Sequence, residues 1–157
     1  MELALVLPIL IMLIFGIIQF GIVFAQKLAL SNAAREAARA GTVAINASAQ
    51  MTCQEIADQI KNTVGTIALN TSDVQVWIIL KPDPTVAAAT YPPVCSGNTG
   101  TSMSNPATTP CTNASSTAQL TAQLIVQVST PATIAIPFAV STGVTLTGSG
   151  AYRCEYQ

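Results

Sequence analysis

The N-terminus of the chain carries a run of 23 residues, Leu3 to Ala25, that contains no charged side chain. As a helix this run would be ~35 Å long, which is enough to cross a hydrocarbon core of about 30 Å. A secretory signal sequence has a shorter apolar run with basic residues before it. A core helix of a soluble domain would need protein on every side, and the rest of the chain is too small for that. We therefore predict a membrane-spanning helix, in which a kink at Pro8 is tolerated.

The helix is expected to continue past the bilayer. Residues 26–40 are rich in alanine, leucine, arginine and glutamate, which favour helix, and Gly41 is expected to end it. Four alanines form a smooth face: Ala33, Ala34, Ala37 and Ala38. This face suits either close packing with a helix or sheet, or a plain alanine-rich stalk. The chain thus divides into a transmembrane or assembly helix, residues 1–41, and a head domain, residues 42–157.

A second helix is predicted from Ala49 to Leu69. Thr52 and Glu55 fit a capping box at its start. Apolar side chains recur at helical spacing and form one stripe, which predicts a core-facing side. These residues are Ile56, Ile60, Val64 and Ile67.

Three later segments alternate between apolar and polar residues, as half-buried strands do. They are Asp73–Lys81, Gln119–Thr130 and Val144–Tyr156. Trp77 lies on the opposite face of its strand, where it either covers a helix or lies at a subunit contact, and packing is favoured. The segment between Pro131 and Pro137 is expected at an edge or bend. Helices first and strands afterwards indicate an α+β fold, with the long helix packed on a three- or four-stranded antiparallel sheet.

Residues 82–118 differ from the rest of the head. Of these 37 residues, 24 are Pro, Gly, Ser, Thr or Asn, a composition that predicts a long loop without helix or strand. Thirteen are Ser or Thr, which suits O-glycosylation. Asn-X-Ser/Thr triplets, possible N-glycosylation sites, begin at Asn46, Asn70 and Asn113.

The four cysteines allow three disulfide pairings. We predict a local bridge between Cys95 and Cys111 inside the loop, which leaves Cys53 to pair with Cys154. The alternative is four free thiols. Disulfides imply an exported head. The basic residues after the apolar run would instead favour a cytoplasmic head by the positive-inside rule, but we give more weight to the even cysteine count and the Ser/Thr-rich loop.

Charge and composition argue against several functions. Only 8% of the residues are charged, the net charge is -1, and histidine is absent. A basic nucleic-acid surface is therefore not expected. Without histidine the chain lacks the commonest general base and zinc ligand, and the usual hydrolase triad cannot form. No glycine-rich phosphate loop is present. We expect a structural protein without catalytic residues, metal or cofactor.

Five features of residues 2–40 resemble TadE-like pseudopilins. They are Glu2, the Leu7-Pro8 pair, Phe15-Gly16, Phe20-Gly21, and the tail from Asn32 to Arg39, NAAREAAR. The resemblance implies a pilin-like fold and a subunit of a type IV-related Tad pilus, which polymerises through its hydrophobic helix. It also implies a prepilin peptidase and pilus assembly machinery as partners, inner-membrane anchoring before assembly, and final localisation in a cell-surface filament with a role in adhesion.

In this family the peptidase cuts after a glycine a few residues before a glutamate, which corresponds to Glu2. No such glycine precedes Glu2 in this sequence, so the cleavage site is not assigned. Two interpretations of Glu2 remain: its carboxylate lies in water at the interface, or it pairs with the α-amine of a neighbouring chain inside an apolar core. The expected assembly residues are Glu2, Leu3, Pro8, Phe15 and Phe20.

Two alternatives to a main pilus subunit remain. One is a minor pseudopilin that stays in the membrane to initiate assembly. The other is a monomeric, membrane-anchored binding module that uses the loop around Cys95 and Cys111 for recognition.

Overall fold

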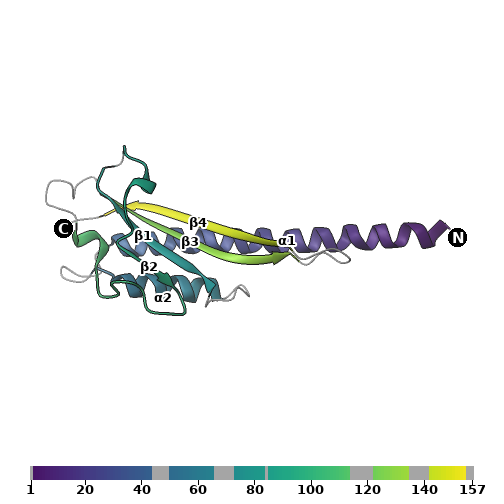
Figure 1. The fold of residues 1–157 in the computed structure, drawn as a ribbon, viewed down its shortest axis with the longest axis horizontal. Coiled ribbons are helices and arrows are strands. Elements are labelled where there is room, and N and C mark those ends of the chain that lie inside the picture. The colour runs from purple at the N-terminus through teal and green to yellow at the C-terminus, as the bar shows by residue number, and fades with distance from the viewer. Residues whose placement is uncertain are drawn as a thin grey trace.

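The structure is a computed structural model of the chain. It describes residues 2–43, 50–65, 73–83, 85–113, 122–134 and 142–154. Figure 1 shows a rod that projects from a head, with the C-terminal half of the rod forming part of the head. The predicted α+β fold is confirmed.

The rod is helix α1, Glu2–Thr42, whose 41 residues would extend ~60 Å at the usual rise. It continues through Pro8 and past Gly41 to Thr42, so the expectation that Gly41 stops the helix after Ala40 is wrong. Gly41 serves packing instead: a Cβ there would lie 2.7 Å from Ile56 Cδ1 and 2.8 Å from Leu124 Cδ2. After it, the hydroxyl of Thr42 donates to the carbonyl of Arg39 at 2.8 Å.

The described strands form one four-stranded antiparallel sheet in the order β2-β1-β3-β4. Their bounds are Gln75–Lys81 for β1, Cys95–Asn98 for β2, Gln123–Ile134 for β3 and Thr142–Arg153 for β4. The three predicted strands are confirmed as β1, β3 and β4, with shifted ends.

Pro131 lies inside β3, at its far end. There β3 pairs with β4, through Pro131 and Thr145, while its pairing with β1 already ends at Ser129. A proline is tolerated here because no described residue pairs with this side of β3 beyond Ser129. Residues 132–134 of the segment expected at an edge or bend continue β3 and pair with β4 but not with β1, whereas residues 135–137 lie outside the described residues.

The C-terminal half of α1 packs against the sheet and against α2, Cys53–Val64 (Figure 1). The four predicted alanines, Ala33, Ala34, Ala37 and Ala38, are all buried, so the smooth face is a packing face and not a stalk. β4 meets it with two glycines. A Cβ on Gly148 would lie 2.8 Å from the backbone of Leu30, and one on Gly150 would lie 2.5 Å from Ala34 O. Small residues on both elements thus allow close backbone approach.

Helix α2 has the predicted capping box, although it begins at Cys53 and not at Ala49. Thr52 is its N-cap and forms the reciprocal capping box with Glu55, whose carboxylate accepts from the Thr52 backbone N–H at 2.7 Å. This hydrogen bond, followed by the one from the Thr52 hydroxyl, lowers the pKa of the Glu55 carboxyl. The stripe is buried at Ile56, Ile60 and Val64, while Ile67 lies outside the described residues. The helix is shorter than predicted because it ends at Val64.

The expectation of a loop without secondary structure over residues 82–118 is wrong. This segment contains β2 and two short 3-10 helices, Ala88–Thr90 and Pro110–Asn113. β2 forms because the edge of β1 offers backbone partners: Val94 donates to Ile78 O at 2.8 Å and Thr99 donates to Val74 O at 2.9 Å. The stretch from Val94 to Asn105 contains no proline, so its backbone donors are available despite its polar composition.

All four cysteines are disulfide-bonded, but the predicted pairing is wrong. Cys53 pairs with Cys95, and Cys111 pairs with Cys154. The Cα atoms are 6.4 Å and 5.7 Å apart, respectively. The local Cys95–Cys111 bridge does not form because Cys95 belongs to the edge strand β2, which the structure brings to the start of α2.

The segment after β2 then caps this same helix start. Carbonyls of Thr108 and Pro106 accept from the backbone N–H groups of Cys53 and Gln54 at 2.8 Å and 3.1 Å. These bonds satisfy free donors at the N-terminus of α2. The segment therefore folds back over the helix, and it delivers Cys111 to the end of β4 instead of to Cys95.

Candidate assembly surface

The N-terminal half of α1 presents apolar side chains to the outside on every face. From Val6 to Phe24 its exposed large apolar side chains range from 39% exposed at Ile11 to 73% at Phe20. A helix that is apolar all round belongs inside lipid or among other apolar helices. This is the one helix of the described residues that is long and apolar enough to cross a membrane, and the head does not cover its most apolar stretch.

Three of the predicted assembly residues lie on this surface. Pro8, Phe15 and Phe20 are all exposed, and the ring of Phe20 stacks on Phe24 one turn later, with ring centroids 6.3 Å apart. Such a pair forms a flat apolar ridge. Glu2 and Leu3 are in the first turn of α1, so the backbone places them at the tip of the rod, and their side chains lie outside the described part.

The exposed surface ends at a sharp boundary. Leu28 is 49% exposed, whereas Leu30 is fully buried against the head. Just before this boundary the Lys27 ammonium donates to the backbone carbonyl of Thr147, and its Nζ lies 3.4 Å from the Thr147 hydroxyl. Thr147 is on β4, an edge strand, so Lys27 ties the base of the rod to the edge of the sheet.

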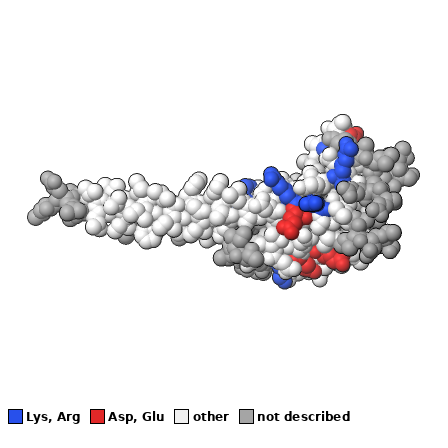
Figure 2. Space-filling model, turned by 180° about the vertical axis from the view of Figure 1, so that it is seen from behind, with Lys and Arg blue, Asp and Glu red and all other residues white. Residues whose placement is uncertain are grey.

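Charged side chains are also unevenly distributed between the N-terminal half of α1 and the head. Seen from behind, the described rod is white over most of its length, and the blue and red side chains gather over the head in Figure 2. Arg35, Glu36 and Arg39 are exposed on the part of α1 that the head covers from the other side. The rod is thus suited to an apolar medium and the head to water.

The predicted glycosylation sites are not tested by the structure. Asn113 ends a 3-10 helix and its side chain is not described, while Asn46 and Asn70 lie outside the described residues. Within the described residues, no group of three His, Cys, Asp or Glu side chains could hold a metal ion.

Sequence reasoning missed two features that fix how the rod joins the head. One is the contact between Lys27 and Thr147, which are 120 residues apart. The other is the pair Gly148 and Gly150 under α1. The sequence Gly-Ser-Gly puts both glycines on one face of the strand, and this is a readable sign of close backbone approach.

The fold and the exposed rod define a protein with an N-terminal helix that could span a membrane and an α+β head. Comparison with known families gives the class a name: the family model of TadE-like proteins matches residues 1–39. The match covers α1 as far as Arg39, so the likeness to TadE-like proteins lies in the N-terminal helix and does not extend over the head. The resemblance predicted from the sequence is confirmed. No curated protein and no solved structure matches the chain.

Proposed function

We propose that the chain is a structural subunit of a Tad-like extracellular pilus, which polymerises through the N-terminal half of α1. The observation that carries the proposal is the uncovered apolar rod from Val6 to Leu28, in the segment that matches the TadE-like family model. The role is structural and not catalytic. Its partners are further copies of the chain, a prepilin peptidase and the pilus assembly machinery.

The energetics of the rod favour two environments. In the inner membrane, lipid covers the apolar side chains before assembly. Outside the membrane, each large side chain left in water forgoes about 1.5–3 kcal/mol of burial free energy. A rod with this many exposed apolar side chains is therefore stable outside lipid only when neighbouring rods cover it. A filament at the cell surface with the rods in its centre meets this requirement.

Glu2 sets the register of the filament in this proposal. Its place in the first turn of α1 puts a carboxylate at the tip of an otherwise apolar rod. In the filament centre it pairs with the α-amine of the neighbouring chain. A subunit that docks one step out of register would leave the carboxylate buried and unpaired, at a cost of about 3–5 kcal/mol.

Glu2→Ala tests this assignment. Filaments sheared from cells are measured by yield and by length under negative-stain electron microscopy. We expect Glu2→Ala to abolish filaments or shorten them severely. The control is Glu36→Ala, because Glu36 is an exposed acid on the same helix but within the head, and it should leave filaments normal. Normal filaments from Glu2→Ala would refute the pairing role.

The same sheared fraction separates the alternatives. A main pilus subunit is recovered as the bulk of the polymer. A minor pseudopilin is required for filaments but is present in them only at trace levels. A monomeric, membrane-anchored binding module stays with the membranes, and deletion of the protein leaves filaments unchanged.

A further inference from the structure

We infer that the head binds neutral carbohydrate on the face of the sheet that points away from α1. This inference concerns the head alone and is independent of polymerisation. It starts from the alternation of side chains in the strands. One face of the sheet packs on the helices through residues such as Val76 and Val128, which are buried. The intervening residues lie on the other face, and over much of the sheet they are polar and uncharged.

The strand register places these residues in two rows across the whole sheet. The first row follows from the pairs Trp77–Ser96, Trp77–Gln127 and Gln127–Ser149. It therefore runs across all four strands in the order Ser96, Trp77, Gln127, Ser149. At ~4.8 Å between neighbouring strands, a row is about 14 Å long, which suits a short oligosaccharide.

The second row runs beside the first. The pairs Gln75–Asn98, Gln75–Ser129 and Ser129–Thr147 give the order Asn98, Gln75, Ser129, Thr147. Every residue of the two rows except Trp77 carries an amide or a hydroxyl, and neither row contains an ionisable side chain.

The surface along the rows is hollowed on both sides of the tryptophan. A cavity of about 450 Å³ is lined by Trp77, Gln127 and Ser149 of the outer face, and at the β4 edge of the sheet also by Lys27 and Ser31 of α1. A smaller one of about 230 Å³ is lined by Trp77, Ser96 and Asn98 among others. The larger volume is within the range of small-ligand sites. Trp77 thus lies between two polar hollows and is only half-buried.

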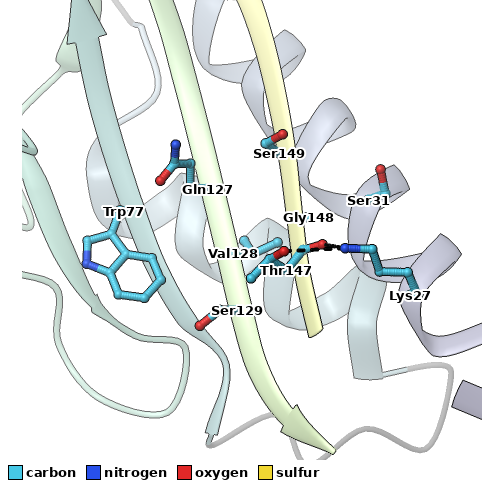
Figure 3. Close-up of a pocket in the computed structure, with 9 residues that line it drawn as sticks. All are labelled: Lys27, Ser31, Trp77, Gln127, Val128, Ser129, Thr147, Gly148 and Ser149. Carbon is cyan, nitrogen blue, oxygen red and sulfur yellow. Dashed lines mark hydrogen bonds between the residues drawn. The ribbon is translucent and has the colours of Figure 1, made fainter. Parts of the chain in front are cut away.

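Figure 3 shows the side chains of the larger cavity on three neighbouring strands and on α1. Within the described residues the amide of Gln127 and the hydroxyl of Ser149 make no hydrogen bond, whereas dashed lines join Lys27 to Thr147. Lys27, the one charged group among the described residues that line the cavity, is therefore already hydrogen-bonded. The amide and the hydroxyl remain available to a ligand.

This combination of groups selects one ligand chemistry. A nucleic acid or other polyanion needs several cations. Among the described residues that line the two cavities, Lys27 is the only charged one. A hydrocarbon ligand would leave amides and hydroxyls without partners. A neutral sugar has hydroxyls that donate and accept, as these side chains do, and C–H faces that can lie on an indole ring. We therefore assign neutral oligosaccharides to this surface.

Trp77 makes the test direct, because it is the only tryptophan of the chain. Cellohexaose, chitohexaose and maltohexaose are each titrated into the full-length protein in dodecylphosphocholine micelles, whose headgroup carries no sugar, while tryptophan emission is recorded. We expect a saturable change with at least one of the three. Gln127→Ala should weaken the binding at least fivefold. The matched control is Asn62→Ala, because Asn62 is an exposed amide on α2, and it should bind like the unaltered protein.

Two results would overturn the inference. In the first, none of the three hexasaccharides changes the emission, or Gln127→Ala responds like Asn62→Ala. In the second, emission changes only with the concentration of the protein itself, which would make the two rows an interface between copies of the chain. Neither result bears on filament formation, because the protein in micelles is not polymerised, and loss of filaments in Glu2→Ala leaves the sugar titration unaffected.

Discussion

Gly150→Ala is expected to destabilise the head, because this position is where the rod comes closest to the sheet. The added Cβ would lie 2.5 Å from both Ala34 O and Arg35 Cα. An ordinary contact between carbon atoms is about 3.5–4.0 Å, so backbone would have to move by about 1 Å. Overpacking of this kind costs about 1–3 kcal/mol, and two clashes with backbone atoms place it at the upper end. Alanine also reduces the conformational entropy of the unfolded chain, which offsets about 0.4–1 kcal/mol of this loss. The net loss is about 2 kcal/mol in the free energy of unfolding.

The assay is urea unfolding of the full-length protein in micelles, followed by circular dichroism and by Trp77 emission. Two further glycines of the same strand give a graded series. Gly148→Ala brings Cβ to 2.8 Å from Leu30 backbone atoms, and Gly143→Ala meets no described atom within 4 Å. We expect the loss of stability to follow the order Gly150, Gly148, Gly143, with Gly143→Ala neutral or slightly stabilising. If Gly150→Ala and Gly143→Ala unfold at the same urea concentration, the close approach of α1 to β4 is wrong.

Three other perturbations give separate tests. The double change Cys111→Ser with Cys154→Ser should lower the free energy of unfolding by about 4 kcal/mol in the chain-entropy model for a loop of this length. Mass spectrometry of a non-reduced digest of the unaltered protein should recover the Cys111–Cys154 bridge. A linked Cys95–Cys111 peptide would contradict the fold. Thr52→Ala should cost about 1 kcal/mol through the lost cap. Hydrogen bonds from the Thr52 backbone N–H and then from its hydroxyl lower the pKa of Glu55, so this carboxylate stabilises the fold at neutral pH and loses the effect as pH falls through its lowered folded pKa. Thr52→Ala removes the hydroxyl but keeps the backbone donor, so it should flatten the acid side of the stability profile only in part. Lys27→Met should lower the free energy of unfolding by up to about 1 kcal/mol, measured by urea unfolding, and an unchanged midpoint would show that its contact with Thr147 contributes nothing.

Local sequence patterns predicted most elements of the fold because short-range physics forms them. The capping box at Thr52 and Glu55 depends on groups three residues apart, and the alternation in β3 follows from strand geometry. β2 could not be predicted in this way. Its four residues, CSGN, have neither an apolar alternation nor strong strand propensity, and they pair because β1 offers an unpartnered edge.

The two candidate sites also differ in how far the sequence predicts them. The apolar rod could be predicted because it consists of consecutive residues without charge. The rows around Trp77 could not be found in the sequence, since each of the four strands supplies two residues and the register alone aligns them. The separation of Lys27 from Thr147 hid the contact at the base of the rod for the same reason.

The sequence alone determined that this protein has an apolar rod with a TadE-like signature and a helix-then-strand head, because composition and periodicity act over a few neighbouring residues. The tertiary structure decided which cysteines pair, which edge β2 joins and where the rod meets the sheet. These choices depend on backbone hydrogen bonds and close packing between segments far apart in the chain. Neither kind of contact produces a periodic pattern in the sequence.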